Sequence, residues 1–140
     1  MRRHHLIIVA AAVALVWAGT ALAGGWATVK LSSLPRGVSA GEPWVVNITV
    51  LQHGLATQPL CCLKPTVTIR KVAGLRSTSA SSSTVKVFQA TPTGRVGVYR
   101  ARVVFPTAGT WRYQVWDGFT QYGGARSHTF SPVKIAPAGT

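Results

Sequence analysis

The stretch that decides the fold is Trp44-Val45-Val46-Asn47-Ile48-Thr49-Val50. Large apolar side chains recur at every second position, and polar Asn47 and Thr49 stand between them. This period of two is typical of a β-strand with one face against a core and the other toward water. The segment therefore predicts a strand of an antiparallel sheet.

Similar short runs recur on both sides of this strand, separated by residues that favour turns. We predict seven strands, over residues 26–31, 44–50, 66–72, 84–90, 99–105, 111–115 and 129–135. Seven strands at this spacing predict an all-β fold, an immunoglobulin-like antiparallel β-sandwich. Four aromatic residues on the apolar faces are expected in its core: Trp44, Tyr99, Trp111 and Tyr113. The serine-rich run 77–83 predicts a long surface loop.

The N-terminus has the pattern of an export signal. Arg2 and Arg3 precede an apolar run over residues 6–17, and Ala21-Leu22-Ala23 supplies small residues for cleavage. We expect a signal helix over residues 1–23 and one domain over residues 24–140. An uncleaved anchor is the alternative, because residues 18–20 could extend the run. The protein is then exported, secreted or membrane-anchored, and it enters a membrane only through this segment.

The charge balance is strongly basic, with 15 lysines and arginines against two acids and a net charge of +13. Such a surface attracts anions, among them phospholipid headgroups and cell-wall polymers. The basic residues are spread along the chain and no nucleic-acid motif occurs, so we expect a solvated basic surface and no specific nucleic-acid partner. The expected partner is an envelope protein or an anionic surface of the envelope.

Few residues of this chain could act as a general acid or base. Its two acids, Glu42 and Asp117, lie in turn-like segments and are expected to be solvated turn residues. The sequence contains no Gly-x-Ser-x-Gly elbow, phosphate-binding loop or dinucleotide fingerprint. We therefore expect the protein not to be an enzyme.

The segment from Leu51 to Leu63 holds most of the reactive side chains, namely His53, Cys61 and Cys62. Imidazole and thiolate are ligands that Cu(I) and Zn(II) prefer, and His128 is a further donor. The alternatives are a structural role for His53 beside Gly54, and cysteines that are small buried hydrophobes, a vicinal disulfide or one intermolecular bridge. The residues leave these alternatives open.

Several short segments along the chain form a recognisable succession: Leu34-Pro35-Arg36-Gly37, Ala40-Gly41-Glu42-Pro43, Val50-Leu51-Gln52-His53-Gly54, Pro65-Thr66-Val67, Gly97-Val98-Tyr99 and Phe105-Pro106-Thr107-Ala108-Gly109-Thr110-Trp111. Together they resemble the YtkA-like family, small exported or membrane-anchored β-sandwich domains related to the FixH-like domains. The resemblance implies an immunoglobulin-like fold and an envelope location. Because some related domains occur in copper handling or oxidase assembly, it also implies His53 as a candidate ligand. The Cys61-Cys62 pair departs from the family pattern.

The function that these observations favour is a non-catalytic, exported binding or accessory module of the cell envelope. The alternative is a copper-binding accessory protein that uses His53 with Cys61 or Cys62. Copper is the only cofactor that either interpretation includes.

Overall fold

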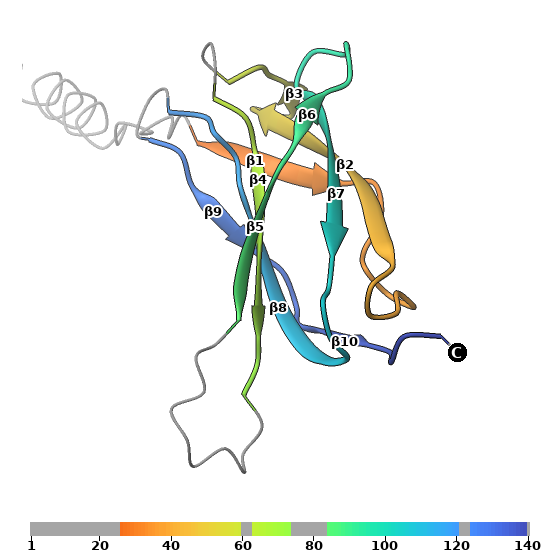
Figure 1. The fold of residues 1–140 in the computed structure, drawn as a ribbon. Helices are drawn as coiled ribbons and strands as arrows, with labels where there is room; N and C mark the ends of the chain where they lie inside the picture. Colours follow the sequence, from red (N-terminus) through yellow and green to blue (C-terminus); the bar gives the residue numbers. More distant parts are fainter. Residues whose placement is uncertain (1–25, 60–62, 74–83, 121–123, 140) are drawn as a thin grey trace, which may run out of the picture.

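The computed structural model describes residues 26–59, 63–73, 84–120 and 124–139. Its strands form two antiparallel sheets (Figure 1). The first sheet has the order β1 (Ala27–Leu31), β2 (Pro43–Gln52), β7 (Val98–Val104) and β6 (Thr91–Pro92), with β3 (Leu55–Ala56) pairing with β2. The second has the order β10 (Val133–Ile135), β8 (Gly109–Trp116), β4 (Thr66–Lys71) and β5 (Val85–Gln89), with β9 (Ser127–Thr129) pairing with β8. The prediction of an all-β fold is confirmed.

The register between β2 and β7 explains the alternation seen in the sequence. Trp44 pairs with Val103 and Ile48 pairs with Tyr99, so that large side chains of the two strands fall in the same inward rows. All four are buried. The intervening residues of β2 face outward, where Asn47 accepts a hydrogen bond from Arg100 Nε at 3.3 Å.

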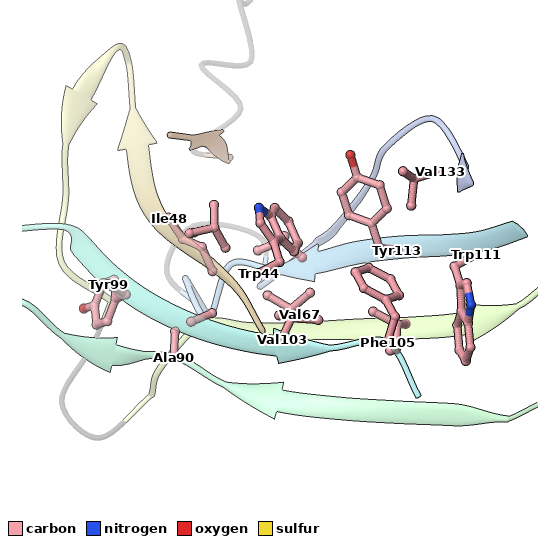
Figure 2. Close-up of a cluster of buried hydrophobic side chains, with 14 of the residues drawn as sticks. Trp44, Ile48, Val67, Ala90, Tyr99, Val103, Phe105, Trp111, Tyr113 and Val133 are labelled. Atoms are coloured by element: carbon pink, nitrogen blue, oxygen red, sulfur yellow. The ribbon is translucent and has the colours of Figure 1, made fainter. Parts of the chain in front are cut away.

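The core lies between the two sheets, which is the arrangement of a β-sandwich (Figure 2). Trp44 of the first sheet meets Tyr113 of the second edge to face, with ring centroids 5.6 Å apart. Phe105 and Trp111 make a similar contact at 5.8 Å. The Trp44 indole N–H donates to Ser33 Oγ at 3.0 Å, so the ring is buried without losing its hydrogen bond. The four aromatic residues expected in the core are all buried there.

The strands differ from the prediction where proline interrupts the pattern. The expected strand 129–135 is divided into β9 and β10, because Pro132 between them has no N–H to give to a ladder. The segment Thr91–Pro92, which lies outside the predicted strands, forms the short strand β6 at a sheet edge, where proline is tolerated. The serine-rich run 77–83 and the predicted signal helix lie outside the described residues.

The sandwich has two distinct ends. The first, which we call the hairpin end, carries Trp26, the turn His53–Gly54 and the turn Gly94–Gly97. The strands β3 and β6 belong to this end and are labelled near the top of Figure 1. The second, the bridge end, is tied by a parallel bridge between Ser39 and Ala136. No described helix is long and apolar enough to cross a membrane. Every strand and core side chain that the structure describes lies between Ala27 and Ile135, so this part of the chain carries its own core.

Candidate functional site

His53 occupies the two-residue turn between β2 and β3. Gln52 pairs with Leu55 across the turn, and His53 and Gly54 both have positive φ, at 51° and 79°. Two consecutive left-handed residues define a type I′ hairpin, whose twist matches that of the strands. Histidine is one of the few residue types enriched at positive φ, so the turn by itself explains a histidine at this position. The side chain is exposed.

The predicted metal site joins His53 to Cys61 and Cys62. Both cysteines lie outside the described residues, so their distance to His53 is not given by the structure. Among the residues it does describe, no three His, Cys, Asp or Glu side chains come together in a group that could hold a metal ion. The copper site on His53 stays a prediction. The further donor, His128, is engaged elsewhere.

Asp117 is a buried acid, and the expectation that it is a solvated turn residue is wrong. It is 1% exposed and immediately follows β8. Its Oδ1 accepts the backbone N–H groups of Phe119 at 2.9 Å and Arg126 at 3.1 Å. Its Oδ2 lies 2.8 Å from Nε2 of His128, on β9. The carboxylate therefore fastens both ends of the segment between β8 and β9, and each oxygen is used in doing so.

Glu42, the other acid, does behave as a turn residue. It is exposed, and its Oε2 accepts the backbone N–H of Ser39 at 3.1 Å. Its own backbone N–H donates to Ser39 O. The two side-chain carboxylates of the chain thus serve local structure, one at each end of the sandwich.

The basic side chains dominate the surface. Ten of the lysines and arginines that the structure describes are exposed: Lys30, Arg36, Arg70, Lys86, Arg95, Arg100, Arg102, Arg112, Arg126 and Lys134. Within the described ranges, the only close contact between a carboxylate and a basic side chain joins Asp117 to His128. The chain has only two acidic side chains, and Glu42 makes no such contact with any residue that the structure describes, so none of these ten cations is paired with an Asp or Glu.

Two arginines stand directly opposite each other on the outer face of the second sheet. Arg70 of β4 pairs with Arg112 of β8 in the ladder. Like charges in this relation repel and destabilise a sheet. Beside them is a concavity of about 250 Å³ that is also lined by Thr68, Gln114 and Thr129. Hydroxyl and amide groups next to two guanidinium groups give this face the chemistry of an anion-binding surface.

A larger hollow lies on the outer face of the first sheet, toward the hairpin end. Its volume is about 650 Å³. Two cations, Lys30 and Arg95, contribute to its lining, together with apolar side chains: Leu31, Leu51, Ala56, Val96 and Val98. The hollow thus combines positive charge with an apolar surface.

Two buried tyrosines have altered acidity. Burial raises the pKa of Tyr99 above its usual value, because the phenolate would lose its hydration. Burial also raises the pKa of Tyr113, and the positive charge of Arg36 partly opposes that rise. Both tyrosines belong to the core and bear on stability at high pH.

Comparison with known proteins gives no family for this chain. No protein-family model matches it, and no curated protein matches it. The YtkA-like resemblance stays a prediction based on the segments quoted above.

Proposed function

We propose that this protein is an exported, non-catalytic binding module with an immunoglobulin-like fold, which attaches to an anionic surface of the cell envelope. The observation that carries the proposal is the exposed set of lysines and arginines with no carboxylate side chains to neutralise them. A surface of this kind concentrates polyanions around it. The chemical group that we expect it to bind is the phosphate of a lipid headgroup or of a wall polymer.

The strand order supports the immunoglobulin-like part of the proposal. The first sheet, β1-β2-β7-β6, corresponds to the order A-B-E-D, and β10-β8-β4 in the second corresponds to G-F-C. The strand β5 adds an edge beside β4. The parallel bridge between Ser39 and Ala136 links the segment after β1 to the end of β10.

The structural roles of the two acids support the non-catalytic part of the proposal. A carboxylate that acts as a general base must reach a substrate proton. Both oxygens of Asp117 are hydrogen-bonded inside the fold, and Glu42 sits in an exposed turn. A binding role requires neither acid.

The test uses residues 24–140 and two anionic surfaces. Vesicles of phosphatidylglycerol mixed with phosphatidylcholine, and beads bearing a poly(glycerol phosphate) wall polymer, are compared with pure phosphatidylcholine vesicles. We expect binding to the anionic surfaces only, and we expect it to weaken strongly between about 50 mM and about 500 mM NaCl as the charges are screened. Equal binding to the neutral vesicles, or retention that salt does not change, would contradict the proposal.

A further inference from the structure

The hairpin end exposes large apolar side chains. Leu55 on β3 is 73% exposed, Val96 is 63% exposed and Trp26 is 54% exposed. The sheet brings them to the same end, because Gln52 pairs with both Ala27 and Leu55, and Val50 N–H donates to Gly97 O at 2.8 Å. Exposed apolar groups gathered in this way indicate a contact surface.

Cations stand beside these apolar groups. The guanidinium of Arg126 lies 3.8 Å from the ring centroid of Trp26. Arg95 precedes Val96, and both line the hollow of about 650 Å³. Of the two acids, Glu42 lies at the bridge end, and Asp117 is buried with both carboxylate oxygens hydrogen-bonded inside the fold. The hairpin end is therefore both apolar and positively charged.

We infer that the hairpin end docks on a lipid bilayer with anionic headgroups. Trp26, Leu55 and Val96 enter the boundary between headgroups and acyl chains, while Arg95 and Arg126 remain at the level of the phosphates. Tryptophan is favoured at this depth, and arginine can bury its stem while its charge stays in water. Apolar burial and attraction to anionic lipid together give reversible binding at a membrane surface. This inference rests on the proposed function and selects the lipid as its anionic surface.

The direction of the chain agrees with this orientation. Trp26 precedes the first residue of β1, so the chain enters the domain at the hairpin end. The apolar run over residues 6–17 lies only a short stretch before it in the sequence. If that run is kept as an anchor, the membrane attachment and the docking surface belong to the same end of the sandwich.

Tryptophan fluorescence tests the orientation directly. Residues 24–140 contain Trp26 and three other tryptophans, of which Trp44 and Trp111 are buried. On phosphatidylglycerol–phosphatidylcholine vesicles with brominated acyl chains, we expect quenching that is mostly lost in Trp26→Phe, a variant that keeps an apolar ring. Quenching of bound protein that Trp26→Phe leaves unchanged would overturn the inference.

A matched pair of double variants tests the apolar contact. We expect Leu55→Thr with Val96→Thr to weaken binding to these vesicles by about tenfold, since partial burial of two such side chains is lost. The control, Val45→Thr with Val87→Thr, removes two exposed valines from the outer faces of the sheets and should change binding by less than about twofold. Equal effects of the two pairs would overturn the inference.

Charge variants separate this inference from the proposed function. Arg95→Gln with Arg126→Gln removes two charges at the hairpin end, and Arg70→Gln with Arg112→Gln removes two elsewhere. We expect the first pair to weaken vesicle binding more. If both pairs weaken it equally, or if the wild type binds only the wall polymer, the docking inference is overturned and the proposed function stands. If the wild type binds neither anionic surface, both are overturned.

Discussion

Asp117 shows what a single acid does in a chain that has almost none. Its carboxylate accepts hydrogen bonds from the Phe119 and Arg126 backbones and meets the His128 ring. Burial of a charged group is costly unless hydrogen bonds replace its hydration, and here they do. Loss of the acceptor would leave buried donors without a partner, which costs more than the bonds themselves contribute.

We expect Asp117→Ala to lower the free energy of unfolding by about 3 kcal/mol. Asp117→Asn should cost less, because its amide oxygen can still accept the two backbone N–H groups. Urea denaturation followed by fluorescence measures both. Glu42→Gln is the matched control, and its effect should stay within about 0.5 kcal/mol because the side chain is exposed. Equal losses for Asp117→Ala and Glu42→Gln would refute this account of Asp117.

A copper site on His53 can be tested without breaking the turn. Asparagine is favoured at the positive φ that His53 adopts, so His53→Asn should keep the hairpin while removing the imidazole. The copper alternative predicts that the reduced domain binds Cu(I) stoichiometrically and that His53→Asn lowers the affinity at unchanged unfolding free energy. A competition titration with a Cu(I) chelator measures this. Affinity unchanged by the substitution would remove His53 from the ligands.

The sequence allowed a structural role for His53 beside Gly54, but it did not predict the burial of Asp117. Both residues precede a glycine and follow a strand, so their local patterns are alike. The difference arises because the chain returns after Asp117 and brings the Arg126 N–H and the His128 ring to its carboxylate. The pairing of β9 with β8 brings these partners to Asp117, and no local sequence pattern predicts that pairing.

At the scale of elements, periodicity predicted the strands wherever a strand contributes alternating large side chains to the core. The residues of β2 and β8 are the clearest cases, with Trp44 and Trp111 on their inward faces. Short elements carry too few residues to show a period, so β3 and β6 were missed. The like-charged pair Arg70–Arg112 was missed for another reason, because β4 and β8 are not consecutive in the chain.

The junction of β3 and β7 depends on a close approach at Gly97. A Cβ added there would lie 2.7 Å from the Thr57 backbone nitrogen, and the residue has φ +70°. Gly94, in the same turn, has φ +86° but open space around it. We expect Gly94→Ala to cost about 1–2 kcal/mol from the backbone alone. Gly97→Ala should cost about 2 kcal/mol more because of the clash.

Thermal and urea unfolding of these two alanine variants measure the difference. Both substitutions carry the penalty of a positive φ. The difference between their losses of unfolding free energy therefore reports the steric clash at Gly97 alone. Equal losses would mean that β3 shifts away from Gly97 without cost.

The core strands β7 and β8 each bury a tyrosine, and these buried tyrosines lower the stability of the fold at alkaline pH. The pKa of Tyr99 is raised in the folded state, so above pH 10 an unfolded chain releases a proton that the folded chain keeps. Stability must therefore fall as the pH rises through this range. Urea midpoints between about pH 8 and about pH 11.5, with phenolate absorbance, measure the fall. Tyr99→Phe should make the fall of stability with pH less steep. An unchanged slope would mean that other groups cause the fall.

At the scale of the whole molecule, the excess of positive charge opposes folding. The exposed lysines and arginines repel one another in the compact state, and salt screens that repulsion. We expect the melting temperature to rise between about 10 mM and about 300 mM NaCl. Arg70→Gln should raise stability at low salt by about 0.5 kcal/mol, because it relieves the pair with Arg112. Salt-independent melting would contradict this.

The bridge between Ser39 and Ala136 has a consequence for the order in which the protein is assembled. It joins a segment near the start of the domain to one that follows every strand, and Ile135 of β10 completes the core beside it. A chain that leaves a ribosome or a translocation channel from its N-terminus presents β10 last. The sandwich can therefore close only after almost the whole domain has emerged. Until then, the edge of β8 that pairs with β10 remains unpaired. Pairings so distant in sequence make folding slow, which gives chaperones time to act on the incomplete sheet.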